Sequence, residues 1–296
     1  GVRGQSLKEE DIIDTIKTCN THDWALIFTN SGKVYKMRIW DIPESSKNAK
    51  GTPLVNFLSI KQNERLEAFL TLTNGELEGK GFVFFGTEAG IAKRTELADF
   101  ANIRSSGIRA INLKDGDNLV FAGLTDGKQD MLITTSEGQS IRFKETDCRP
   151  MGRAARGVAG IKLKKAGDRV VGATTISAKD TGSKNVSLLV VSANGYGKRT
   201  LVGAYKVQNR GGSGILTYKV STKTGKLVSA KPIDSNNKPD VLIASQSGKI
   251  IRLKASGISQ LKRDTMGVKL INLSGSDKVT SVGVLEEEEE KLPEKK

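Results

Sequence analysis

Histidine and cysteine are almost absent from this sequence, and their scarcity excludes several kinds of chemistry. His22 is the only histidine, so histidine-based catalytic triads and histidine-containing zinc sites are excluded. The two cysteines, Cys19 and Cys148, have neither metal-binding nor redox spacing, which is typical of a reducing compartment. We therefore expect no metal or cofactor in this chain and a cytoplasmic location.

Long apolar runs and aromatic residues are also scarce. No run approaches the ~20 apolar residues of a membrane span, and the first residues lack the core of a signal peptide. Four tyrosines and two tryptophans are too few to favour stacking on single-stranded bases. Positive charge, in contrast, is abundant: 47 lysines and arginines against 33 acids give a net charge of +14. Such an excess favours a polyanionic partner, and nucleic acid fits better than a membrane surface.

A hairpin pattern recurs five times along the chain, at a period of about fifty residues. Each copy is an apolar run, a turn ending in glycine, and a second strand that carries lysine or arginine. The turn glycines are Gly32, Gly90, Gly138, Gly195 and Gly248. Turns of the Asn-Gly and Glu-Gly kind between two β-rich runs predict hairpins, because they need positive φ.

Two further elements complete each repeat. One is a basic loop centred on glycine, found at residues 47–51, 104–109, 153–157, 210–214 and 262–267. The other is a polar turn followed by a strand rich in Leu, Val and Ala, as at residues 116–122 and 167–173. About four strands in about fifty residues is typical of a propeller blade.

The repeats predict one all-β domain over residues 1–285, with an incomplete sixth unit. The expected units are residues 1–50, 51–106, 107–156, 157–213, 214–266 and, in part, 267–285. The stretch from Ser6 to Lys17 could begin a capped helix, but it falls where a strand belongs, and we interpret it as a strand. Residues 286–296 carry a net charge of −3 and are expected to form a disordered acidic tail, which leaves +17 on the repeats.

The repeats resemble the C-terminal domain of the DNA gyrase A protein and its paralogue in topoisomerase IV. The segments that carry the resemblance are residues 8–14, 20–23, 32–37, 54–56, 142–145, 151–152 and 194–200. The resemblance implies a six-bladed β-pinwheel with four-stranded blades, in which a strand passes between neighbouring blades. It also implies a non-catalytic domain of an ATP-dependent type II topoisomerase that wraps DNA and so yields negative supercoiling.

The same resemblance implies partners and a diagnostic motif. The implied partners are double-stranded DNA, the N-terminal portion of the gyrase A protein, and the gyrase B protein in an A2B2 enzyme of the bacterial cytoplasm and nucleoid. ATP and Mg²⁺ would act elsewhere in that enzyme. Gly1-Val2-Arg3-Gly4 resembles the second half of the gyrase box Gln-Arg-Arg-Gly-Gly-Lys-Gly, with Val2 in place of a glycine and Arg3 in place of the lysine. The topoisomerase IV domain, which wraps DNA little, therefore stays open as an alternative.

The candidate DNA contacts are the cations of the basic loops and of the strand after each hairpin turn. Repeated at equivalent places, they would form a positive belt along one edge of a ring, able to offset the cost of bending a duplex without reading bases. They are Arg3, Lys36, Arg38, Lys47, Lys50, Lys93, Arg94, Arg104, Arg109, Arg142, Lys144, Arg149, Arg153, Arg156, Lys198, Arg199, Arg210, Arg252, Lys254, Lys262 and Arg263.

Two other functions remain as alternatives. A propeller scaffold for protein partners would have a neutral rim with an apolar or mixed patch, which the charge of the repeats disfavours. An enzyme built on a propeller is disfavoured because the sequence has no histidine cluster and no convincing pair of acids. The stretch Gly195–Thr200 resembles a phosphate loop only superficially, and a hairpin turn explains it better.

Overall fold

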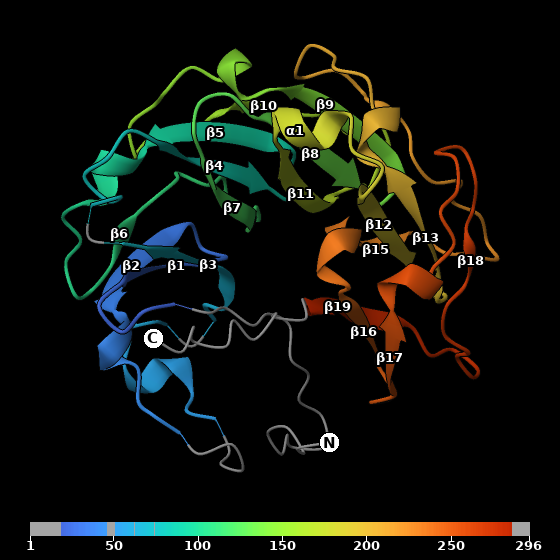
Figure 1. Cartoon of the computed structure of the whole chain (residues 1–296), viewed down its shortest axis with the longest axis horizontal. Coiled ribbons are helices and arrows are strands. Elements are labelled where there is room, and N and C mark those ends of the chain that lie inside the picture. Colours follow the sequence, from blue (N-terminus) through green and yellow to red (C-terminus); the bar gives the residue numbers. More distant parts are fainter. Residues whose placement is uncertain (1–18, 46–50, 62, 74, 286–296) are drawn as a thin grey trace, which may run out of the picture.

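The computed structural model describes residues 19–45, 51–61, 63–73 and 75–285, which form five antiparallel β-sheets arranged around a centre as the blades of a propeller (Figure 1). Each blade contains a hairpin and the third strand of the same sequence repeat, and in every blade but the first the short strand that joins the preceding sheet lies between them in the chain. The hairpin and third strands are β1 (Trp24–Thr29), β2 (Lys33–Arg38) and β3 (Leu66–Leu72) in the first blade, and β4 (Phe82–Thr87), β5 (Ile91–Glu96) and β7 (Leu119–Thr125) in the second. The third blade has β8 (Asp130–Thr135), β9 (Gln139–Lys144) and β11 (Val170–Ile176). The fourth has β12 (Val186–Ser192), β13 (Tyr196–Leu201) and β15 (Leu227–Asp234), and the fifth has β16 (Asp240–Ser245), β17 (Ile250–Lys254) and β19 (Val279–Leu285).

Four two-residue strands complete the first four blades. They are β6 (Ile108–Arg109), β10 (Val158–Ala159), β14 (Ile215–Leu216) and β18 (Val268–Lys269). Each pairs with the second hairpin strand of the preceding blade, so that β6, which follows the hairpin of the second blade, joins β2 of the first. The predicted passage of a strand between neighbouring blades is therefore present. Figure 1 shows β6, β10 and β18 on the periphery and β3, β7, β11, β15 and β19 near the centre.

Among the residues that the structure describes, helical structure is confined to short turns between strands. The α-helix α1 (Ala178–Thr181) has Ser177 as its N-cap in a capping box with Asp180. Single turns of 3₁₀-helix span Ile39–Asp41, Leu54–Asn56, Leu97–Phe100, Glu145–Asp147, Val202–Ala204, Ser235–Asn237 and Ala255–Gly257. Within the described residues, no helix has the length and apolarity that crossing a bilayer requires.

The expectation of six blades is corrected to five within the part of the chain that the structure describes. Residues 267–285, expected as part of a sixth unit, contribute β18 to the fourth sheet and β19 to the fifth. Exchange of the outer strand causes the difference, because consecutive segments of one sequence repeat lie in different blades. The segment Ser6–Lys17 and the acidic tail lie outside the described residues.

The turn glycines and the outer strands are linked by a recurring hydrogen-bond pattern. The carbonyl of Gly32 accepts from the N–H groups of Ala110 and Ile111, at 2.8 and 3.2 Å. Gly90, Gly138 and Gly195 accept in the same way from the residues after β10, β14 and β18. All five turn glycines have φ between 75° and 84°, which confirms the predicted hairpins and explains why glycine is needed there.

Blades are held together by apolar side chains from both faces of the hairpin strands. Phe28 of the first blade meets Phe85 of the second with ring centroids 5.5 Å apart, and Phe84 on the other face lies 6.2 Å from Phe143 of the third. Because both faces of these strands are covered, their apolar residues are consecutive rather than alternating. The far face of the first blade is covered by Leu58 and its neighbours, which pack on Ile27.

Candidate nucleic-acid interface

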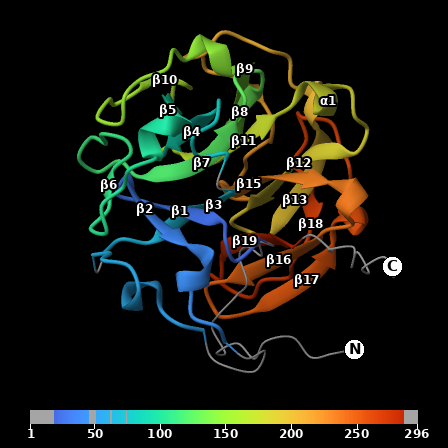
Figure 2. The ribbon, with the colours of Figure 1, turned by 60° about the vertical axis from the view of Figure 1, so that its left-hand side comes forward.

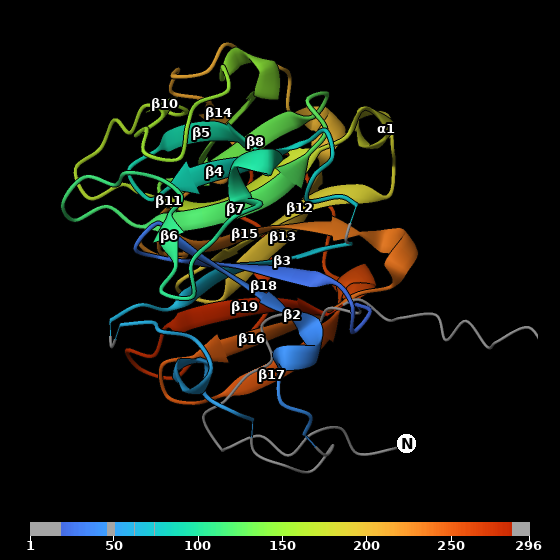
Figure 3. The same cartoon turned by 90° about the vertical axis from the view of Figure 1, so that its left-hand side faces the viewer.

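Four connecting segments on the periphery each carry at least one exposed lysine or arginine, and we call them the first to fourth basic loops. They comprise residues 101–107, 149–157, 206–214 and 259–267, and each leads directly into an outer strand. Figure 2 shows β6 and β10 on the outer side of the ring, and in Figure 3 they lie on one side of it while α1 lies on the other. The repeat therefore delivers the loops to equivalent places.

The second, third and fourth basic loops each accept a main-chain hydrogen bond from a residue that follows the preceding outer strand. The N–H of Asn112 donates to the carbonyl of Ala155 at 3.1 Å, and the N–H of Lys162 donates to that of Gly212 at 2.8 Å. The N–H of Lys219 donates to the carbonyl of Thr265 at 3.1 Å. These bonds link successive basic loops along the rim.

Glycine ends each basic loop for a steric reason. Gly107, Gly157, Gly214 and Gly267 all have φ between 71° and 99°. A Cβ at Gly157 would lie 2.6 Å from the carbonyl oxygen of Ala92, and one at Gly214 would lie 2.4 Å from that of Ser140. Only glycine lets the loop reach the neighbouring sheet so closely before the chain enters the outer strand.

The loop cations predicted from the sequence lie at or near the surface. Arg104, Arg149, Arg156 and Lys262 are exposed, as is Arg109 in the adjoining strand β6, while Arg153, Arg210 and Arg263 are half-buried. Two of the half-buried arginines also bond the preceding outer strand: Arg210 donates to the carbonyl of Ala159 at 3.1 Å, and Arg263 to that of Leu216 at 2.8 Å.

Five cations of the hairpin strands do not lie on the exposed edge where the sequence placed them. Their residues are 0–8% exposed: Lys93, Arg94, Arg142, Lys198 and Arg199. Each is at the third or fourth position after a turn glycine, where the passing basic loop or the adjoining connection covers the strand. Lysine and arginine at these positions therefore hold the blades and loops together, and the sequence pattern alone did not separate them from surface cations.

The buried arginines bind across blade boundaries. Arg142 donates to Asp130 of the same sheet at 2.6 and 2.9 Å and to the carbonyl of Tyr205 at 3.0 Å. Arg199 donates through Nε to the carbonyl of Ile258 at 2.9 Å, and burial lowers its pKa. Arg94 lies 4.5 Å from the centre of the Phe82 ring and 3.7 Å from Glu145.

The buried lysines bind main-chain oxygens. Nζ of Lys93 donates to the carbonyls of Ala110 and Arg153 at 2.7 and 2.8 Å. Nζ of Lys198 donates to the carbonyls of Lys262 and Arg263 at 2.6 and 2.5 Å and to Oγ1 of Thr265 at 3.0 Å. Burial lowers the pKa of each lysine to about 8, since the surrounding oxygens do not fully replace water around the charge.

The remaining hairpin cations differ from blade to blade. Lys144 and Lys254 are exposed, and the side chain of Arg252 is 64% exposed although it pairs with Asp240. Lys36 is half-buried, 4.4 Å from the centre of the Trp24 ring, and burial lowers its pKa. Arg38 stacks on the same ring at 3.6 Å. Gly1, Val2, Arg3, Gly4, Lys47 and Lys50 lie outside the described residues.

Sequence reasoning missed several cations near the outer strands. They are exposed and lie within or beside the basic loops or just after an outer strand: Lys162, Lys164, Lys165, Lys206, Lys219 and Lys269. The available signal was their place within about eight residues of the glycine that ends the second, third or fourth loop. Only the exchange of outer strands between blades shows that these positions lie on the outer rim of the ring.

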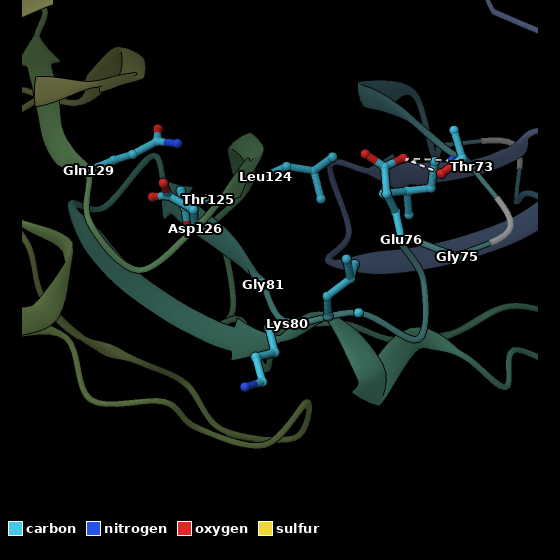
Figure 4. Close-up of a pocket in the computed structure, with 12 residues that line it drawn as sticks. Thr73, Gly75, Glu76, Lys80, Gly81, Leu124, Thr125, Asp126 and Gln129 are labelled. Carbon is cyan, nitrogen blue, oxygen red and sulfur yellow. Dashed lines mark hydrogen bonds between the residues drawn. The ribbon is translucent and has the colours of Figure 1, made fainter. Parts of the chain in front are cut away.

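One hollow away from the loops is lined by the connection between the first two blades. Figure 4 shows this cavity of about 490 Å³, with Glu76, Lys80, Asp126 and Gln129 among the residues around it. Glu76 accepts hydrogen bonds from the N–H and hydroxyl of Thr73, at 2.7 and 2.9 Å, and these bonds lower its pKa. The Glu76 carboxylate is thus hydrogen-bonded within its own turn, and the cavity is not part of the surface formed by the basic loops.

Blades that exchange their outer strands define a β-propeller of the pinwheel kind. Comparisons with known proteins identify the family within that class. The family described as "DNA gyrase C-terminal domain, beta-propeller" matches residues 23–73, 81–126, 129–177, 187–234 and 239–286, one match for each observed blade. This chain belongs to that family.

Relatives and solved structures agree with this assignment. The DNA gyrase A protein of Staphylococcus epidermidis is 38% identical over 290 residues, and that of Staphylococcus aureus is 39% identical over the same length. The match covers 98% of this chain and 32% of each relative, so the chain spans about a third of the curated relatives. The fold is similar to the C-terminal domain of a DNA topoisomerase IV (TM-score 0.80, 24% identity, 90% of this chain and 80% of that one). It is also similar to a DNA gyrase A C-terminal domain (TM-score 0.71, 24% identity, 96% and 92%).

Proposed function

We propose that this chain binds duplex DNA along its basic loops and bends or wraps it around the outer rim without reading bases. The observation that carries the proposal is the series of exposed loop cations at equivalent places in successive blades. Phosphate contacts of this kind position a duplex but carry no sequence information. Glycines in the loops let main-chain N–H groups approach the phosphates closely.

Within a larger enzyme, this wrapping would give strand passage a preferred direction and so produce negative supercoiling. Support comes from the relatives, which are DNA gyrase A proteins. The partners would then be the N-terminal portion of the gyrase A protein and the gyrase B protein in an A2B2 assembly of the bacterial cytoplasm. ATP and Mg²⁺ would be used outside this domain, which would itself be non-catalytic.

A salt titration tests DNA binding directly. We expect affinity for a duplex to fall steeply with salt, with a log–log slope of about −0.9 for each phosphate contacted. Shuffling the sequence of the duplex should leave the affinity nearly unchanged. Tight binding that ignores ionic strength, or that depends on sequence, would contradict the proposal.

A topology assay separates wrapping from simple binding. Relaxed closed-circular DNA is incubated with the chain, nicked and resealed by ligase, and its linking number is measured. A shift of one sign supports chiral wrapping. DNA binding without a shift supports the alternative that the chain acts as a topoisomerase IV domain does, an alternative that the similarity in fold keeps relevant.

A further inference from the structure

Ammonium groups from hairpin strands lie beneath three of the four basic loops. Lys198 of β13 bonds three oxygens of the fourth loop, in residues 262, 263 and 265. Lys93 of β5 bonds the carbonyl of Arg153 in the second loop, and Lys36 of β2 bonds that of Ala101 in the first. Each lysine comes from the blade whose outer edge the loop passes, so the loop is held from beneath by the neighbouring sheet.

The third basic loop is held differently and provides an internal comparison. The position of Lys93 and Lys198 is occupied by Ile141 in the third blade, and its Cδ1 would lie 3.5 Å from a Cβ built on Gly212. That loop is instead fixed by its own Arg210, which donates to the carbonyls of Asp147 and Ala159. A lysine is therefore not required by the blade itself, which indicates that it serves the particular loop above it.

The loops above the lysines are themselves rich in cations. Arg153 and Arg156 belong to the second loop, and Lys262 and Arg263 to the fourth. An ammonium placed under such a loop adds repulsion, and Lys93 and Lys198 are completely buried, so neither can touch a duplex. Three N–H donors on a tetrahedral nitrogen can nevertheless hold several carbonyls at once, which no apolar side chain can do. Charge-assisted bonds of this kind are stronger than neutral ones.

We propose that Lys93 and Lys198 are positioning residues of the DNA-binding surface. Each holds the backbone of a basic loop in the position from which its cations meet the phosphates, while the lysine itself makes no contact with DNA. The inference rests on the proposed function and adds to it the device that orders its binding loops before DNA arrives. Ordering in advance lowers the entropic cost of immobilising the loop on binding.

The test compares substitutions that remove the same charge from different places. Lys198→Met removes the donors beneath the fourth loop but keeps its volume and leaves Lys262 and Arg263 in the sequence. Lys179→Met removes an exposed charge on α1, far from the loops along the chain. Lys262→Met removes one loop cation directly. Duplex affinity is measured for the 296-residue chain by fluorescence anisotropy over a range of salt, well below the melting temperature of each variant.

We expect Lys198→Met to lose about two phosphate contacts, those of Lys262 and Arg263. The slope of log affinity against log salt concentration should then be shallower by about 1.8, and the affinity should be roughly tenfold or more lower. Lys262→Met should lose about one contact and Lys179→Met none. Lys93→Met should repeat the result through the second loop. Hydrogen exchange of the amides of residues 262–265 should accelerate in Lys198→Met and stay unchanged in Lys179→Met.

A second variant keeps the test open if burial makes Lys198→Met unstable. Thr265→Val removes one acceptor of Lys198 together with the hydroxyl that donates to the carbonyl of Lys262 at 3.0 Å. It changes no charge, so any loss of affinity comes from loop position, and only a loss shared with Lys198→Met supports the lysine. We expect an affinity about two- to threefold lower than in Thr222→Val, a substitution at an exposed threonine outside the loops, in line with one weakened contact.

The outcomes separate the two proposals. If the unaltered chain binds duplex DNA with a steep salt slope but Lys198→Met and Thr265→Val match their controls, the positioning role is wrong and the DNA-binding function stands. If the unaltered chain binds no duplex, the proposed function itself fails.

Discussion

Nη2 of Arg142 lies 2.6 Å from Oδ2 of Asp130, across the hairpin of the third blade, with the arginine side chain almost fully buried. Arg142 also reaches the carbonyl of Tyr205 in the adjoining connection, so the pair fixes one blade to the next. Removing the acid would leave a buried guanidinium without its charged partner.

Asp130→Ala should therefore lower the free energy of unfolding by about 2–4 kcal/mol, because breaking a buried pair costs more than the pair contributes. Denaturant unfolding followed by circular dichroism measures the change. Asp115→Ala, at an exposed acid in a turn, is the control and should stay within about 0.5 kcal/mol of the unaltered protein. Equal stabilities of the two variants would show that the ion pair does not hold the blades.

Two glycine substitutions within the second basic loop should differ strongly in their effect on stability. Gly157→Ala places a Cβ 2.6 Å from the carbonyl oxygen of Ala92 at a φ of 99°, so we expect a loss of about 2–4 kcal/mol in the free energy of unfolding. Gly152→Ala meets nothing within 4 Å and should change stability by less than about 0.5 kcal/mol. Thermal and denaturant unfolding of both variants compare them directly, and a tolerated Gly157→Ala would mean that the loop can move away from the sheet.

Stability should rise with pH between 8 and 9 because of Lys93 and Lys198. Their pKa is about 8 in the folded protein and near 10.4 when solvated, so in this window the unfolded chain binds more protons. The free energy of unfolding should increase by roughly 1 kcal/mol per lysine across the window.

The double variant Lys93→Met/Lys198→Met should lack most of this rise, and urea unfolding at fixed ionic strength compares the two proteins. Burial raises the pKa of Cys148 to about 11, so from about pH 8 upward an unfolded chain with an ordinary thiol loses that proton first, which opposes part of the rise. The thiol is present in both proteins, so the difference between them isolates the lysines. Identical pH dependence in both proteins would exclude strongly shifted lysines.

Neutralising exposed loop cations should weaken DNA binding without affecting the fold. In the triple variant Arg104→Gln/Arg156→Gln/Lys262→Gln, we expect the salt slope to become shallower by up to about 2.7, with unfolding unchanged. The control variant Lys128→Gln/Lys179→Gln/Lys184→Gln has the same net charge, but its substitutions fall in the connections between blades. A gel-shift titration across salt compares them. Equal losses would mean that net charge, rather than the rim, attracts DNA.

The fold was largely predictable from the sequence because its signals are local. Turn glycines such as Gly90 need positive φ wherever they occur, and apolar runs such as Val83–Phe85 predict strands covered on both faces. The number of blades was harder, because β18 is separated from its partner β13 by the whole hairpin of the next blade. No pattern within one repeat reveals that a two-residue strand pairs with the preceding sheet.

The candidate site was predictable only in part, for the same physical reason. By itself, the sequence determined that cations recur beside hairpin turns and glycine loops, and that the excess positive charge suits a polyanion. Only the tertiary structure decided that Arg156 faces solvent while Lys93, in an equally basic setting, lies beneath a loop with its ammonium on carbonyl oxygens. Burial depends on which segment crosses the strand, and that segment comes from another repeat, about sixty residues further along the chain for Lys93 and Arg153.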